Sequence, residues 1–155
     1  MTGKNLTALI DMAIQREVEA YDFYMEILEK LSDAAIKETL LFIAGEEKKH
    51  RAFLESYRQG RYDLKAFRMA DVTYYKIAEH ENEPDVRENM PKEHVFLIAA
   101  HRELRSHNFY RELAEAHPEG EAKGMLLKMA NEELKHKEKM EYLYANTAFP
   151  QTSGG

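Results

Sequence analysis

Apolar side chains recur in four stretches of the chain at alternating steps of four and three residues. This spacing keeps side chains on one face of a helix that packs in a bundle. The stretches cover residues 5–31, 33–57, 91–117 and the segment from the Pro118-Glu119-Gly120 break to residue 146. Ser32 and Asp33 between the first two stretches are residue types that start helices. The pattern predicts four long helices paired into two antiparallel hairpins.

A long segment separates the two predicted hairpins. It is rich in aromatic residues, among them Tyr62, Phe67, Tyr74 and Tyr75, and a short helix is expected in it near residues 72–80. We therefore expect an all-α four-helix bundle with one long crossover. The predicted organisation is one domain over 1–155, made of a hairpin at 5–58, a crossover at 59–90, a hairpin at 91–146 and a tail at 147–155.

Acids and histidines interrupt the inward-facing positions at the middle of each helix. The six side chains are Glu17, Glu47, His50, Glu103, Glu133 and His136. Buried carboxylates are costly when isolated, and clustered ones also repel each other. Their presence on the inner face predicts that cations lie among them.

An internal repeat supports the same residues. A shift of 86 residues aligns Glu17 with Glu103, Glu47 with Glu133 and His50 with His136, without a gap. Identical residues number 7 of 19 in the first helices of the hairpins and 9 of 22 in the second helices. Of the seven histidines, only His50 and His136 follow a glutamate by three residues. The sequence therefore predicts a duplicated hairpin that carries the same ligand set twice.

Composition narrows the chemistry further. The chain has 22 Lys and Arg against 28 Asp and Glu, a net charge of −6, which does not suit a basic nucleic-acid interface. With no cysteine, a metal must bind to carboxylate, imidazole or carbonyl groups, a set that suits iron or manganese better than copper or zinc. No signal peptide or membrane span is visible, so a cytoplasmic protein without membrane contact is expected.

The two Glu and Glu-x-x-His sets resemble the di-iron site of the ferritin-like superfamily, and the chain is most similar to its rubrerythrin-like branch. The resemblance implies that Glu47 and Glu133 bridge two iron ions. Glu17 and His50 would complete one ion, and Glu103 and His136 the other. Two departures stand out: the chain has no cysteine for a rubredoxin-like electron donor, and Ser106 stands where rubrerythrins have a further glutamate.

Three more residues are expected beside this site. Tyr24 and Tyr110, seven residues after Glu17 and Glu103, match tyrosines that family members place there. His107 follows Glu103 by one helical turn, where the first repeat has Tyr21, and is interpreted as a hydrogen-bond partner of the ligands rather than as a seventh ligand.

The resemblance implies an oxidoreductase whose Fe2+/Fe3+ pair reduces hydrogen peroxide or oxidises Fe2+ with O2, and which draws electrons from an external donor. Manganese is the other metal considered. The alternatives are an iron storage or delivery protein, a dimanganese catalase-like enzyme and a metal-free scaffold. A homodimer or higher homo-oligomer is expected, with the crossover aromatics as a possible interface.

Overall fold

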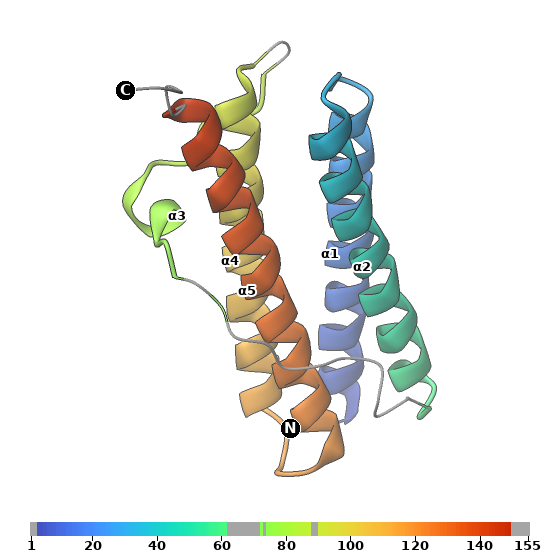
Figure 1. Ribbon diagram of the computed structural model, residues 1–155. Helices are drawn as coiled ribbons and strands as arrows, with labels where there is room; N and C mark the ends of the chain where they lie inside the picture. The colour runs from blue at the N-terminus through green and yellow to red at the C-terminus, as the bar shows by residue number, and fades with distance from the viewer. Residues whose placement is uncertain (1–2, 62–71, 73, 88–89, 150–155) are drawn as a thin grey trace. The chain divides into compact units, whose positions relative to one another are not determined.

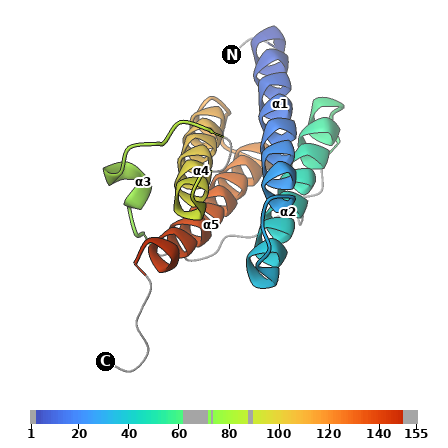
Figure 2. The same ribbon diagram turned by 90° about the horizontal axis from the view of Figure 1, so that it is seen from above.

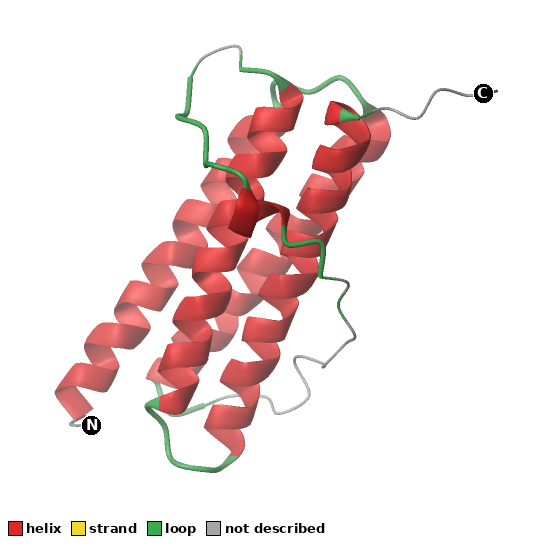
Figure 3. Ribbon diagram, turned by 90° about the vertical axis from the view of Figure 1, so that its left-hand side faces the viewer, coloured by secondary structure: helices red, strands yellow, loops and turns green. Residues whose placement is uncertain are grey.

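The computed structural model describes residues 3–61, 72, 74–87 and 90–149, with side chains from residue 7 onward. These residues form helices and loops without a strand (Figures 1 and 3). The helices are α1 (Gly3–Leu28), α2 (Ala34–Arg58), α3 (Ile77–His80), α4 (Lys92–Glu115) and α5 (Glu121–Ala148). The predicted all-α fold with two long helical hairpins is confirmed. Within the described ranges, no helix is both long and apolar enough to cross a membrane.

The chain divides into two compact units. The first contains Met1–Phe67 with Glu115–Met125, and the second contains Arg68–Ala114 with Leu126–Gly155. In the first unit α1 and α2 lie side by side (Figures 1 and 2). In the second unit α4 lies beside α5, and α3 belongs to the same unit. The single domain expected from the sequence stays a prediction.

The turn between α1 and α2 depends on Asp33. Its Oδ1 accepts a hydrogen bond from the backbone N–H of Ile36 at 3.1 Å, which caps the first turn of α2 as the sequence predicted. The predicted first helix extended to Leu31, but α1 ends at Leu28. The residues between Leu28 and Asp33 are needed to reverse the chain, and Leu31 is still buried.

The turn between α4 and α5 also begins earlier than expected. The sequence predicts a helix that ends at residue 117, whereas α4 ends at Glu115. His117 directly precedes Pro118, and the residue before a proline is disfavoured in a helix. His117 is nevertheless buried, at 8% exposure. Its Nε2 lies 2.6 Å from the hydroxyl of Tyr57, so the end of α2 contacts this turn.

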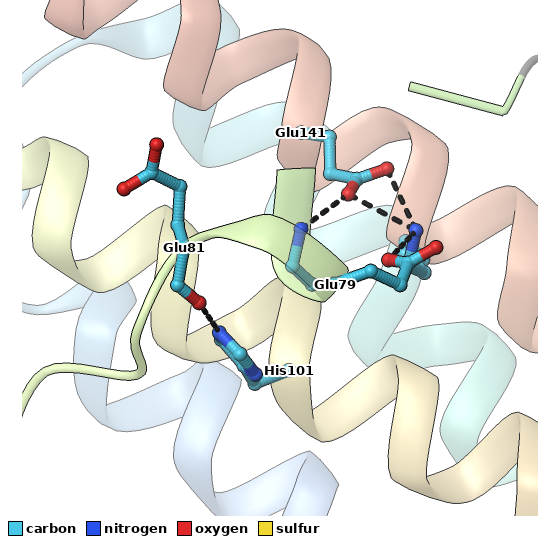
Figure 4. Close-up of polar contacts among 6 residues, drawn as sticks. Glu79, Glu81, His101 and Glu141 are labelled. Carbon is cyan, nitrogen blue, oxygen red and sulfur yellow. Dashed lines mark hydrogen bonds and ion pairs between the residues drawn. The ribbon is translucent and has the colours of Figure 1, made fainter. Parts of the chain in front are cut away.

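In the described part of the crossover, the helical residues are Ile77–His80. The helix expected near 72–80 is limited to α3, which follows Lys76 in a left-handed conformation with φ of 58°. The carboxylate of Glu141 on α5 accepts the N–H of Ala78 at 2.8 Å, and Nε2 of His101 on α4 lies 2.9 Å from the carbonyl of Glu81 (Figure 4). Polar contacts thus anchor this segment to α4 and to α5.

Two of the four aromatic residues named in the predicted crossover are described by the structure, and both are exposed. Tyr62 and Phe67 lie outside the described residues. Tyr74 and Tyr75 are exposed, at 61% and 43%. An interface formed by these aromatics stays a prediction.

The inward positions predicted from the sequence are the core of the two units. Nine apolar members of the pattern are almost completely buried, at 2% exposure or less: Ile10, Leu40, Ile43, Leu54, Phe96, Ala100, Leu126, Met129 and Met140. Members nearer the helix ends, such as Ile14, Leu28 and Ile36, are half-buried. Burial of these side chains is the main stabilising contribution to a helical hairpin. It also brings every acid and histidine of the same pattern inside.

Candidate metal centre

The first unit holds a cluster of two carboxylates and one imidazole. Glu17 comes from α1, and Glu47 and His50 come from neighbouring turns of one face of α2. One ligand atom of each of the three residues lies within 4.8 Å of the others. Nδ1 of His50 is 3.4 Å from Oε1 of Glu17. All three side chains are at 2% exposure or less, so the cluster is shielded from water.

The second unit holds the equivalent cluster. Glu103 comes from α4, and Glu133 and His136 come from one face of α5. Their ligand atoms also lie within 4.8 Å of one another. Nδ1 of His136 is 3.5 Å from Oε2 of Glu103 and 3.9 Å from Oε2 of Glu133. These side chains are buried, with His136 the most exposed at 5%.

The chemistry of each cluster fits a divalent cation. Two carboxylates and a neutral imidazole form a mixed oxygen and nitrogen set, which suits iron or manganese. Without a cation, two carboxylates this close together and removed from water repel each other. Three protein ligands leave further coordination positions for a small molecule. The structure therefore places all six predicted ligands in two clusters of three, each able to hold one ion.

Tyr24 and Tyr110 occupy equivalent places in the two units. Each is at 1% exposure and lies two turns after the cluster glutamate of its own helix. Each ring packs edge to face against the preceding phenylalanine, with centroid distances of 5.4 Å for Phe23 and 5.7 Å for Phe109. Their expected role beside the metal site stays a prediction.

His107 is bound to the backbone of the neighbouring helix. Its Nδ1 donates to the carbonyl oxygen of Ala130 on α5 at 2.8 Å. Burial lowers the pKa of His107 below its usual 6.5, and the charges of Arg111 and Lys137 lower it further, although the hydrogen bond to Ala130 acts in the opposite direction. His107 is thus a neutral imidazole near pH 7.

Sequence reasoning missed a buried ion pair next to the second cluster. Nζ of Lys137 lies 2.9 Å from Oε1 of Glu141 and 2.8 Å from Oε1 of Glu79. Lys137 and Glu141 are at 3% and 1% exposure. Their i, i+4 spacing on α5 predicts an ordinary surface pair, so no signal in the sequence distinguishes them.

The comparisons agree with the geometry. The model of the rubrerythrin family matches residues 1–58, which contain the first cluster. A crystal structure from Thermotoga maritima, provisionally described as a ferritin-like diiron-carboxylate protein, is 25% identical in sequence. The structural match covers 90% of this chain and 93% of the Thermotoga maritima chain, with a TM-score of 0.68. No curated protein matches the chain.

These likenesses support binding of a di-iron centre and leave the activity open. The residues matched by the family model include Glu17, Glu47 and His50, and the structural likeness covers 90% of the chain. The ferritin-like, rubrerythrin-like resemblance inferred from the sequence is therefore confirmed.

Proposed function

We propose that the chain is a di-iron oxidoreductase in which each three-residue cluster holds one iron ion, and which reduces hydrogen peroxide or oxidises Fe2+ with O2. The observation that carries this proposal is the repeated cluster of two buried carboxylates and one imidazole. The pairing of the two ions into one centre rests on the likeness to ferritin-like diiron-carboxylate proteins.

A pair of ferrous ions held by these residues would supply two electrons at once to peroxide or O2. The role of the protein is to hold and balance their charge. The carboxylates of Glu17, Glu47, Glu103 and Glu133 compensate the cations and favour the ferric state. The imidazoles of His50 and His136 bind as neutral donors and moderate this preference. Burial of all six side chains keeps bulk water away from the ligands.

The stoichiometry of bound iron tests the site. The chain is loaded with Fe2+ without oxygen, and tightly bound metal is counted. We expect two ions per chain. Glu47→Ala and His50→Ala should lose this stoichiometry, whereas Glu46→Gln should keep it, because Glu46 is paired with Lys49 on the surface side of the same turn. Two ions retained in the Glu47 and His50 variants would overturn the assignment.

The reaction itself is tested by stopped-flow absorbance. Iron-loaded protein is mixed with one equivalent of H2O2 or, separately, with O2. Faster oxidation by peroxide, with a product that can be reduced again, supports a peroxidase. Equal reaction with O2 and continued consumption of excess Fe2+ supports a ferroxidase. Release of O2 from peroxide by a manganese-loaded chain would instead indicate a catalase-like enzyme.

Partners follow from the same proposal. Turnover with peroxide needs an electron donor, and a chain without cysteine has no thiolate-bound iron centre of its own to supply electrons. We therefore propose an external electron donor.

We also propose that the chain forms a homodimer or a larger homo-oligomer. Sedimentation of the iron-loaded chain measures the oligomeric state. A closed shell large enough to hold mineral would favour iron storage, and a dimer would argue against it.

A further inference from the structure

A pocket of about 440 Å³ lies in the second unit, on the side of α4 and α5 that α3 adjoins. We call it the α4–α5 pocket. Its polar lining residues are Tyr74, Glu79, His107, Asn108, Arg111 and Asn131. This volume is typical of sites for small organic molecules, which combine apolar walls with a few polar groups.

His107 offers an unused hydrogen-bond acceptor in this pocket. A carbonyl oxygen can only accept, so the contact with Ala130 shows that Nδ1 of His107 carries the proton. In a neutral imidazole the other nitrogen, Nε2, then has a lone pair. His107 is at 9% exposure, and the structure gives it no second hydrogen bond to any described residue. His107 therefore lines the pocket with an acceptor that no described residue of the protein uses.

The surroundings keep this imidazole neutral. Burial and the positive charges of Arg111 and Lys137 hold the pKa of His107 below its usual value. On the side of α3, Glu79 also faces the pocket, but its carboxylate pairs with Nζ of Lys137 at 2.8 Å. Nε2 of a neutral imidazole whose proton is on Nδ1 accepts a hydrogen bond from an O–H or N–H group and has no proton to donate to a carboxylate. The complementary ligand is therefore a hydrogen-bond donor.

The remaining walls favour an apolar ring. Leu104, Leu127 and Leu134 line the pocket, and so does Tyr74. An aromatic ring offers flat apolar faces to such a lining. An aromatic hydroxyl is also a stronger donor than an aliphatic one, because its proton is more acidic.

The wall formed by the crossover is held in place. Glu141 on α5 accepts the N–H of Ala78, and Glu79 bonds to Lys137 of the same helix (Figure 4). These contacts hold Ala78 and Glu79 against α5, so this part of the pocket wall is fixed by bonds within the protein. A wall that is already ordered loses less entropy on binding than one that must be ordered.

We propose that the α4–α5 pocket binds a small hydroxylated aromatic molecule, whose hydroxyl donates a hydrogen bond to Nε2 of His107. This site is separate from the two metal clusters in the residues it uses. It does not depend on the proposed function, and it is tested on the chain both without added metal and after loading with iron.

Three probes of similar size test the proposal: phenol, anisole, which lacks the hydroxyl, and benzoate, which is an anion. Affinities are measured by calorimetry, and the ¹⁵N signal of Nε2 of His107 is followed in protein labelled at histidine. We expect phenol to bind about fivefold more tightly than anisole, as the gain of one hydrogen bond implies. Only phenol should shift the Nε2 signal.

A matched pair of variants identifies the acceptor. His107→Phe keeps a ring but removes the lone pair, and should lower the affinity for phenol about fivefold, to that of anisole. His94→Phe makes the same change at an exposed position of α4 outside the pocket and should have no effect. Equal binding of phenol and anisole, tighter binding of benzoate, or unchanged phenol affinity in His107→Phe would overturn the proposal. If His107→Phe does not fold, the comparison of probes and the ¹⁵N signal in the unaltered chain decide the question.

Discussion

Nδ1 of His50 on α2 lies 3.4 Å from Oε1 of Glu17 on α1, the other long helix of the first unit. The equivalent atoms of His136 and Glu103, 86 residues later, are 3.5 Å apart in the second unit. Because each distance is measured within one unit, the agreement does not depend on how the units are placed. The repeat in the sequence is therefore a repeat of side-chain geometry as well.

Removing a cluster carboxylate should have opposite effects with and without metal. In the metal-free chain, Glu47→Gln removes a charge that lies buried near Glu17, so the free energy of unfolding should rise by about 1 kcal/mol. The same change should remove the stabilisation that Fe2+ binding provides, since binding stabilises only a folded site. Urea unfolding with and without Fe2+ measures both. A Glu47→Gln chain that is still stabilised by Fe2+ as strongly as the unaltered chain would contradict the ligand assignment.

The contact between Tyr57 and His117 should contribute measurably to stability. Tyr57→Phe removes a partly buried hydrogen bond of 2.6 Å while keeping the ring, which also packs against Phe53. We expect a loss of about 1 kcal/mol in the free energy of unfolding. Tyr142→Phe, at a position that is 47% exposed, should change it little. Equal values for the two variants would show that the Tyr57 hydrogen bond adds nothing.

Breaking the buried pair of Lys137 and Glu141 should be costly. Lys137→Met leaves the carboxylate of Glu141 buried without its charge partner, and we expect a loss of about 3–5 kcal/mol. Arg51→Met removes the repeat-equivalent cation, whose pair with Glu55 is exposed, and should cost about 0.5 kcal/mol. Thermal and urea unfolding of the two variants measure the contrast. Similar losses would mean that burial of the second pair has no energetic consequence.

The buried imidazole of His107 should make the protein sensitive to acid. Its pKa is lowered below 6.5 in the folded chain, so the unfolded chain takes up this proton first as the pH falls. The stability that depends on neutral His107 is thus fully present above about pH 6.5 and decreases below it. His107→Gln should reduce the difference in unfolding free energy between pH 7.5 and pH 5.5.

His94→Gln, which removes an exposed imidazole from the same helix, is the control for the substitution itself. A direct NMR titration should also place the midpoint of His107 below 6.5. A His107 midpoint at or above 6.5 would show that burial does not control its protonation.

Much of the fold and of the candidate site could be predicted from the sequence, because the deciding signal is local and periodic. The steps of three and four residues place Glu47 and His50 on the same face of a helix as Leu40 and Leu54, and no tertiary knowledge is needed for that. The repeat then identifies Glu133 and His136 in the same way. Helix ends were less accurate, since Pro118 stops α4 before His117 and the turn after Leu28 takes up residues that fit the periodic pattern.

The sequence by itself determined the four long helices, their inner faces and the two equivalent sets of acids and histidines, because helical periodicity and duplication can be read directly along the chain. Only the tertiary structure decided that the ion pair of Lys137 and Glu141 is buried. Its repeat-equivalent, Arg51 with Glu55, has the same spacing but is about half exposed, with no more than an i, i+4 surface contact. The difference arises because α3 packs on α5 and provides Glu79 and the N–H of Ala78 as further partners. Burial of a charged group depends on which distant segment covers it, and that information is absent from the spacing of residues on one helix.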